Sequence, residues 1–389
     1  MEAPPVRLFA PFVGEEELAN VADSISHQWL GLGSKVRDFE EQFLSYLGAS
    51  SGFALNSGTA ALHLALSVFD FPEGAKVLVP SLTFSASASA ILYNNLVPVF
   101  VDSDPETLGI DLEDLDRKWD SECVALIAVH YAGHPLPMDR IVKWAGSRNI
   151  KVIEDCAHTI GSHYLGTPLG LWGDVGCFSF EEKKIMTTGD GGMIVSRHEG
   201  LLDDIPAKRW VGIDKENWEN AQKSVSPEAD GMHWYYEIKV LGWKYNMNDL
   251  SASIGLAQLQ KLPRILEKRR EILERYLDGL RLIGGLELLL PFDSESFAYQ
   301  IFGIRVDDRR GLMRHLSQSR ISSGSHYTPL SVQPLFQRLG ADPCNYIETE
   351  ANRLVTLPFH PGLTNNDVDR VLAAVGSYFE SGELASARG

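Results

Sequence analysis

Between residues 50 and 200, short apolar runs alternate with segments of helical periodicity, and this rhythm limits the folds open to the chain. Buried strands are predicted at 52–55, 76–79, 98–101, 124–129 and 151–153. Helices are predicted between them, at 59–69, 85–94, 112–119 and 138–147. The alternation predicts a mainly parallel sheet with helices on both faces and right-handed crossovers. Because ligands bind beyond the carboxyl ends of such strands, the loops after the strands are where function is expected.

The rest of the chain reads differently. Two more apolar runs, 175–180 and 192–196, flank a turn-rich stretch, and residues 213–236 have the composition of a long surface or interface loop. A helical pattern runs from 248 to 282, where Pro263 predicts a kink or the junction of two helices. We therefore predict a large domain at 1–247 and a smaller C-terminal α+β domain at 248–389.

The charge balance argues against several classes of protein. The 52 acidic and 35 basic side chains give a formal charge of -17, which repels nucleic acid and anionic membrane surfaces. No segment approaches the ~20 uncharged residues of a membrane span. The N-terminus lacks a basic region followed by an apolar stretch, so no secretory signal is visible and a cytoplasmic protein is expected.

Cysteine and histidine spacing gives no support for a metal site. The four cysteines form no CxxC pair, which predicts reduced, mostly buried thiols rather than disulfides. His130 and His134 are four residues apart, but Gly133 and Pro135 argue against the helix that such a ligand pair needs. No metal is therefore predicted.

Residues 56–60, Asn-Ser-Gly-Thr-Ala, follow a predicted strand and open a helix. Backbone N–H groups at a helix N-terminus, with a glycine allowing close approach, suit a phosphate. An ordinary N-cap by Ser57 or Thr59 explains the pattern equally well. Neither GxxxxGK[ST] nor a strand-linked GxGxxG occurs, which disfavours nucleotide hydrolysis and Rossmann-type dinucleotide binding.

The predicted strand at 151–153 runs directly into Glu154 and Asp155. A carboxylate at the end of a buried strand costs desolvation energy unless it meets a cation or a donor, so Asp155 needs a partner. A pyridinium nitrogen, a metal ion or an arginine would each serve. A surface carboxylate without a catalytic role remains the alternative.

Residues 177–192 place Lys183 and Lys184 among apolar residues and glycine turns. Such a setting lowers the pKa of a lysine, which frees its amine to attack a carbonyl group. Two solvated lysines paired with Glu181 and Glu182 are the alternative. A phosphate-binding helix start, an aspartate at a strand end and a lysine bounded by glycines follow one another in the chain. Together they provide three functions that a single cofactor requires.

In this order the motifs closely resemble the DegT/DnrJ/EryC1/StrS family, the pyridoxal-phosphate (PLP) aminotransferases of sugar nucleotides and aminosugar antibiotics. The resemblance covers nearly the whole chain and is carried by segments 31–47, 56–62, 80–84, 129–133, 154–158, 179–180, 184–192 and 242–247. It implies an α/β, aspartate-aminotransferase-like architecture (PLP fold type I). A large domain would hold a mainly parallel seven-stranded sheet, followed by the smaller C-terminal α+β domain.

The resemblance also implies how the cofactor ring would be held. Lys184, ahead of the Thr-Thr-Gly, would form the Schiff base with PLP. Asp155 would pair with the pyridinium nitrogen, and His158 would contact the ring hydroxyl. The ring would stack on Phe84.

The phosphate contacts follow in the same way. The backbone of Gly58 and Thr59 and the hydroxyl of Ser179 would hold the phosphate. Relatives take a further contact from the partner subunit, through an asparagine in a GxN motif. Lys244 stands at that position here and Asn246 lies two residues on, so either could supply it. A homodimer with shared active sites is implied, with 213–246 as interface candidates.

Other positions in or near the motifs bear on the substrate. Glu181 replaces a histidine of many relatives and could alter the pKa of Lys184 or the shape of the substrate pocket. Asp190 replaces a more common glutamate, which should affect packing only. His326 and Tyr327 are implied to lie near the substrate; a loop histidine and a packing tyrosine are the alternatives.

The implied reaction moves an amino group from an amino acid, expected to be L-glutamate, to a keto-sugar. The acceptor is expected to be a nucleotide-linked 4-keto or 3-keto deoxyhexose, although some relatives aminate free cyclitols. Asp155 would keep the ring nitrogen protonated so that the cofactor acts as an electron sink, and Lys184 would also move the proton.

Two other functions fit the same resemblance. A PLP-dependent sugar dehydratase is one, but members with that chemistry replace the lysine by histidine, whereas this chain keeps Lys184. A non-catalytic, PLP-binding regulatory protein is the other. The acidic charge and the lack of an evident helix-turn-helix module argue against it.

Overall fold

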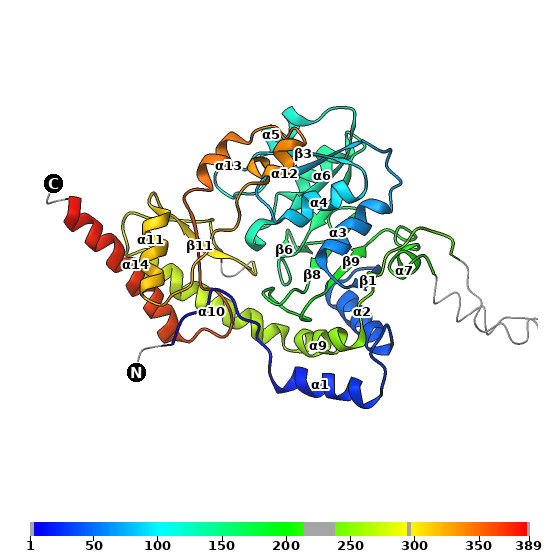
Figure 1. The fold of residues 1–389 in the computed structure, drawn as a ribbon, viewed down its shortest axis with the longest axis horizontal. Helices are drawn as coiled ribbons and strands as arrows, with labels where there is room; N and C mark the ends of the chain where they lie inside the picture. Colours follow the sequence, from blue (N-terminus) through cyan, green and yellow to red (C-terminus); the bar gives the residue numbers. More distant parts are fainter. Residues whose placement is uncertain (1–3, 214–237, 294–296, 387–389) are drawn as a thin grey trace, which may run out of the picture.

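The computed structural model describes residues 4–213, 238–293 and 297–386. Its centre is a seven-stranded sheet in the order β1-β9-β8-β5-β4-β2-β3 (Figure 1). The strands are β1 (Ser51–Leu55), β2 (Lys76–Pro80), β3 (Val97–Val101), β4 (Cys123–Val129), β5 (Lys151–Asp155), β8 (Val175–Ser179) and β9 (Gly192–Ser196). Strands β3, β2, β4, β5 and β8 pair in parallel, whereas β9 is antiparallel to both of its neighbours. The predicted mainly parallel, seven-stranded sheet is confirmed.

Helices cover both faces of this sheet, because successive apolar side chains of a strand point to opposite sides. Val77 and Val79 of β2 share a core with helices α3 and α4, whereas Leu78 between them packs with helices α5 and α6. The helices of this region are α1 (Glu15–Ser26), α2 (Ser34–Leu47), α3 (Gly58–Ser67), α4 (Ser85–Tyr93), α5 (Leu112–Lys118), α6 (Met138–Gly146) and α7 (Ile205–Lys208), with a 3-10 turn at Tyr131–Gly133. A two-stranded hairpin, β6 (His163–Tyr164) and β7 (Thr167–Pro168), follows β5.

The long helical pattern after residue 248 forms two helices, α9 (Asp249–Gln260) and α10 (Leu262–Leu280). Pro263 lies in the first turn of α10, where its missing N–H breaks no helical hydrogen bond. Helix α9 packs on α1 and α2, and α10 continues toward the C-terminal region (Figure 1). Of the two predicted outcomes, the junction of two helices is the one observed.

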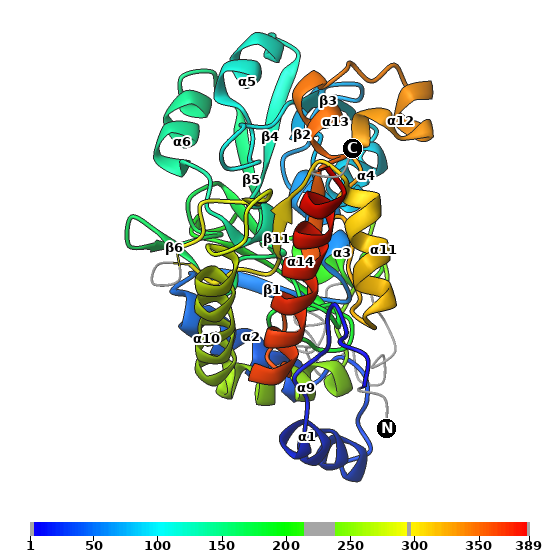
Figure 2. The same ribbon diagram turned by 90° about the vertical axis from the view of Figure 1, so that its left-hand side faces the viewer.

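A second, antiparallel sheet lies in the C-terminal region (Figure 2). It is formed by β10 (Glu287–Leu288), β11 (Phe302–Arg305) and β12 (Leu354–Leu357). Helices in this region are α11 (Arg309–Gln318), α12 (Pro334–Arg338), α13 (Asn345–Glu350) and α14 (Asn365–Ser386), with a 3-10 turn at Leu330–Val332. The predicted smaller α+β region is confirmed, and a domain boundary at 247/248 stays a prediction.

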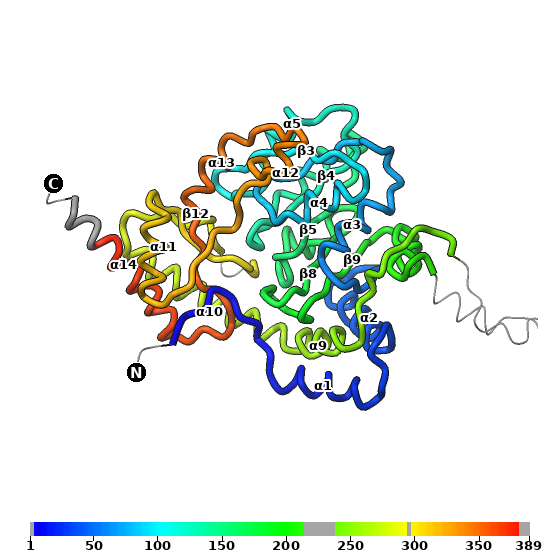
Figure 3. Tube along the Cα trace, in the orientation of Figure 1, coloured from blue at the N-terminus to red at the C-terminus, as the bar shows by residue number. Residues whose placement is uncertain are grey.

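The N-terminal segment reaches across to this second region, as the tube in Figure 3 shows. Val6 forms a bridge with Ile321, and the carbonyl of Leu8 accepts a hydrogen bond from the Phe359 N–H at 3.1 Å. Of the predicted interface segment 213–246, residues 214–237 lie outside the described residues.

All four cysteines are free and buried, as their spacing predicts. Within the described ranges, no helix combines the length and the apolarity needed to cross a bilayer.

Candidate active site

A cavity of about 350 Å³ lies at the carboxyl ends of the parallel strands. It gathers side chains from the start of α3, the start of α4, the end of β5, the loop after β8 and the C-terminal region. Ten predicted site residues line it: Gly58, Thr59, Phe84, Asp155, His158, Ser179, Glu181, Lys184, His326 and Tyr327. Segments separated by more than 200 residues in sequence therefore meet at one site.

Asp155 is the last residue of β5 and is 6% exposed. Its Oδ2 accepts a hydrogen bond from Ser87 Oγ at 2.8 Å, and its Oδ1 accepts one from the N–H of Ala157 at 3.1 Å. Since the Ser87 proton is engaged, Thr83 Oγ1 donates in turn to Ser87 Oγ at 2.8 Å. The partners expected for Asp155 are thus neutral hydrogen-bond donors. They stabilise the carboxylate but leave its negative charge available to a cation.

Lys183 and Lys184 occupy different environments. The Lys183 side chain is 54% exposed and its Nζ lies 3.6 Å from Glu181 Oε1. Lys184 is tied to Glu181 by a backbone hydrogen bond of 2.9 Å, and burial lowers the pKa of its amine, while the charges of Asp155 and Glu181 act to raise it. Lys183 is therefore a solvated lysine paired with glutamate. Lys184 has the environment that lowers a lysine pKa and frees the amine to attack a carbonyl group.

The N-terminus of α3 lies against the end of β8. The Ser57 hydroxyl caps the helix by accepting from the N–H of Ala60 at 3.1 Å. A Cβ at Gly58 would stand 2.8 Å from the Ser179 Cβ, so only glycine lets α3 approach this closely. The N-cap is therefore present, and a hydroxyl from β8 lies beside helix-terminal N–H groups that lack intrahelical partners, an arrangement that suits an anion.

Aromatic side chains form one wall of the cavity. Phe84 is 58% exposed, although it is a large apolar residue, and its ring centroid lies 5.9 Å from that of Tyr327. The ring of Tyr327 lies nearly parallel to that of His158, and its hydroxyl is 3.4 Å from His158 Nε2. Burial, followed by the charge of Lys184, holds the pKa of His158 well below its usual range. An exposed aromatic face in a cavity suits stacking of a flat ring.

His326 and Tyr327 are uncharged at neutral pH. Burial lowers the pKa of His326 to about 4 and raises that of Tyr327. His326 Nδ1 lies 2.8 Å from Thr356 Oγ1, and the Tyr131 hydroxyl donates to the His326 carbonyl. These two residues can therefore hydrogen-bond a ligand but do not offer it a positive charge.

Lys244 and Asn246 lie outside the cavity lining of their own chain. Lys244 Nζ donates to Asn246 Oδ1 at 2.9 Å and lies over the ring of Trp210. Both residues run beside the end of β1, where Asn246 bridges Leu55. A role for either toward a second subunit stays a prediction.

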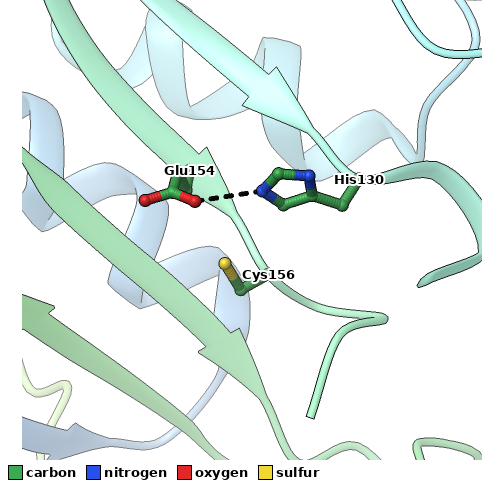
Figure 4. Close-up of side chains that lie close together, drawn as sticks. All are labelled: His130, Glu154 and Cys156. Carbon is green, nitrogen blue, oxygen red and sulfur yellow. Dashed lines mark hydrogen bonds and ion pairs between the residues drawn. The ribbon is translucent and has the colours of Figure 1, made fainter. Parts of the chain in front are cut away.

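A buried trio, His130, Glu154 and Cys156, adjoins the site, with ligand atoms within 4.8 Å of one another (Figure 4). The Leu136 N–H donates to His130 Nδ1, which leaves the imidazole proton on Nε2 facing Glu154. The Glu154 carboxylate accepts from His130 Nε2 and from the backbone N–H groups of Gly170, Trp172 and Gly173. These donors account for the buried charge without a metal ion.

The cavity residues fit PLP, the cofactor that the resemblance implies. They offer a partly buried amine, a strand-end carboxylate, an exposed aromatic face and a helix N-terminus with an adjacent hydroxyl. Those are the groups that the aldehyde, the ring nitrogen, the ring face and the phosphate of PLP require.

The sequence matches the DegT/DnrJ/EryC1/StrS aminotransferase family over residues 11–376. Among curated proteins, the uncharacterized protein MJ1066 of Methanocaldococcus jannaschii is 35% identical over 94% of this chain and 96% of its own length. The spore coat polysaccharide biosynthesis protein SpsC of Bacillus subtilis is 33% identical over 94% of this chain and 95% of its own.

A solved structure is also similar to this chain. The PLP form of the putative sugar aminotransferase Spr1654 from Streptococcus pneumoniae superposes with a TM-score of 0.84 and 28% identity, over 97% of this chain and 99% of that one. The chain therefore belongs to the DegT/DnrJ/EryC1/StrS aminotransferase family, and it is an enzyme whose cofactor is pyridoxal phosphate.

Proposed function

We propose that the enzyme transfers an amino group from L-glutamate to a keto-sugar, specifically a nucleotide-linked 4-keto or 3-keto deoxyhexose. The observation that carries the proposal is the meeting of Lys184 and Asp155 in one cavity, where the lysine amine lies in the field of a carboxylate that only neutral donors hold. The sugar class is supported by two relatives, the putative sugar aminotransferase of S. pneumoniae and the polysaccharide biosynthesis protein of B. subtilis.

Each residue has a distinct task in this proposal. When bound, PLP supplies an electron sink for the reacting carbon of the substrate. Asp155, fixed by Ser87, holds a proton at the ring nitrogen. Lys184 binds the cofactor covalently and, once released, moves a proton between the substrate carbon and the cofactor.

The remaining residues bind and orient. The N–H groups of Gly58 and Thr59 and the Ser179 hydroxyl hold the phosphate. Phe84 covers one face of the ring, and His158 approaches its hydroxyl as a neutral imidazole.

The acceptor lies toward Glu181, His326 and Tyr327, which line the same cavity. We also propose that a second copy of the chain completes the phosphate site, through Lys244 or Asn246, in a twofold dimer.

The covalent link and the substrates can be tested in sequence. Borohydride reduction of the PLP-loaded protein, followed by peptide sequencing, should place the label on Lys184. Glutamate should then discharge the cofactor absorbance of the unreduced enzyme, and the correct keto-sugar should restore it. A label on another lysine would overturn the site, whereas discharge by glutamate without recovery by any keto-sugar would overturn the acceptor class.

A further inference from the structure

A groove of about 510 Å³ runs along the first half of helix α10. Its opposite wall comes from Gly161, residues 297–299 and Phe359. No described residue lines both this groove and the catalytic cavity. We call it the arginine groove, because three arginines of α10 line it: Arg264, Arg269 and Arg270.

Arg269 is 4% exposed, and its hydrogen-bond partners are all neutral. Its Nε and Nη2 donate to the Tyr299 carbonyl at 3.0 and 2.7 Å, and Nη2 also donates to the Gln300 carbonyl at 3.0 Å. Its Nη1 has only a 3.5 Å bond to the Phe359 carbonyl, so Nη1 is the least satisfied part of the guanidinium. Burial lowers the pKa of Arg269 to about 9, and no described acid acts to raise it. A buried cation of this kind gains from a nearby anion.

The other two arginines, Arg264 and Arg270, are exposed on the rim of the groove. Arg275 on the same helix pairs with Asp369 at 2.6 Å, whereas Arg264 and Arg270 form no ion pair with the described residues. Glu267 also lines the groove and likewise pairs with none of them. Three arginines against one glutamate make the groove positive in a chain whose formal charge is -17.

The lining indicates which anion suits the groove. Guanidinium groups match the oxygens of phosphate and carboxylate groups, and a phosphate carries more charge and more acceptor oxygens than a carboxylate. The opposite wall adds apolar rings, those of Phe297, Tyr299 and Phe359. The volume is in the range of small-molecule sites.

Arg269 also connects the groove to the neighbourhood of the catalytic cavity. Gln300, whose carbonyl accepts from Arg269, borders that cavity, and its Nε2 donates to the Lys183 carbonyl at 2.5 Å. The two cavities are therefore neighbours with separate linings.

We propose that the arginine groove binds a small molecule with a phosphate or diphosphate group. Arg264 and Arg270 bind this group from the rim, and the buried charge of Arg269 attracts it from within. The site goes beyond the proposed function, because it lies apart from the catalytic cavity and takes a ligand other than the cofactor.

The test treats the PLP-loaded full chain with phenylglyoxal, which modifies accessible arginines, and identifies them by mass spectrometry. Inorganic pyrophosphate should protect Arg264 and Arg270 but not Arg140, an exposed arginine on α6. Potassium chloride at the same ionic strength should protect none of them, because screening does not fill a site. Uridine diphosphate is the organic probe. Protection by pyrophosphate alone would identify an inorganic anion as the ligand, and protection by both would identify an organic phosphate.

Matched variants measure the affinity. The pyrophosphate concentration that half-protects Arg264 should rise about tenfold in Arg270→Gln, because a charge-assisted hydrogen bond is lost. Arg140→Gln removes the same charge elsewhere and should leave this concentration unchanged. Glu267→Gln removes the acid of the groove and should lower it. All three residues are exposed, so these changes should preserve the fold.

Equal modification of Arg264 and Arg270 with and without both probes would overturn the proposal. Protection by potassium chloride, or the same loss of affinity in Arg140→Gln as in Arg270→Gln, would also overturn it. The measurement contains neither glutamate nor a keto-sugar. Its outcome is therefore independent of the experiments that test the proposed function.

Discussion

Asp155 Oδ2 accepts a hydrogen bond from Ser87 Oγ at 2.8 Å, which joins the end of β5 to helix α4 beside the cavity. Both residues are buried, and the backbone N–H of Ala157 holds the other carboxylate oxygen. Two directed donors thus fix the plane of the carboxylate before any ligand arrives. The orientation of the proposed partner of the ring nitrogen therefore depends on a serine that contacts it from another element.

Ser87→Ala should lower kcat about tenfold, because it removes a hydrogen bond to a charged group. Asp155→Ala should lower it by at least about a hundredfold, with the fold intact, because a preoriented charge is lost. Ser85→Ala is the control, since Ser85 is exposed on the same helix. Near-normal turnover of Asp155→Ala would contradict the electron-sink assignment.

Lys184→Ala should retain PLP weakly and lose transamination, because the proposed covalent and proton-transfer group is gone. Lys183→Ala removes an exposed amine that pairs with Glu181 and should remain active. The loss of cofactor absorbance in a single turnover with glutamate distinguishes the two variants. Turnover by Lys184→Ala together with an inactive Lys183→Ala would show that the two lysines are interchanged.

Gly58→Ala should weaken PLP binding at least about tenfold, because the added Cβ meets the Ser179 Cβ at 2.8 Å and separates the hydroxyl from the helix terminus. Titration of the cofactor-free protein gives the Kd. Gly146→Ala, at the end of α6, has no atom within 4 Å of the new Cβ and should bind as the wild type does. Equal affinity of the two variants for PLP would show that Gly58 is not part of the phosphate site.

Acid should destabilise the protein between about pH 6.5 and pH 4. Burial lowers the pKa of His63, His134, His326 and His360 to about 4 each, so the unfolded chain binds protons in this window that the folded chain does not. As the pH is lowered through this window, the free energy of unfolding decreases by up to ~1.4 kcal/mol per pH unit for each histidine.

Urea unfolding at several pH values checks this slope. His360→Leu should reduce it by about one proton. A slope that His360→Leu does not alter would contradict the buried, neutral state of this histidine.

The sequence predicted the sheet well because its strands are apolar on both faces, so that local pattern and tertiary burial agree. It also distinguished the residues of the cavity as a set, since the motifs follow the strands that meet there. Pro263 marked the change of helix within two residues of the observed junction at Lys261.

Ser87 and Gln300 show where such prediction stops. Neither lies in a motif, and each contacts its partner across 68 or 117 residues of chain. The run of small residues in α4 was the one local signal for Ser87. The role of Lys244 or Asn246 toward a partner subunit stays a prediction, because it depends on contacts between two chains.

The adjacent carboxylates of Glu154 and Asp155 on β5 lie on opposite faces of the sheet. Glu154 is sealed by His130 and three backbone donors, while Asp155 turns toward α4 and the cavity. A slip of one position in β5 would turn each carboxylate to the opposite face of the sheet, taking Glu154 away from its donors and Asp155 away from the cavity. Correct alignment of this one strand is thus a shared condition for folding and for chemistry, so insertions there should abolish both together.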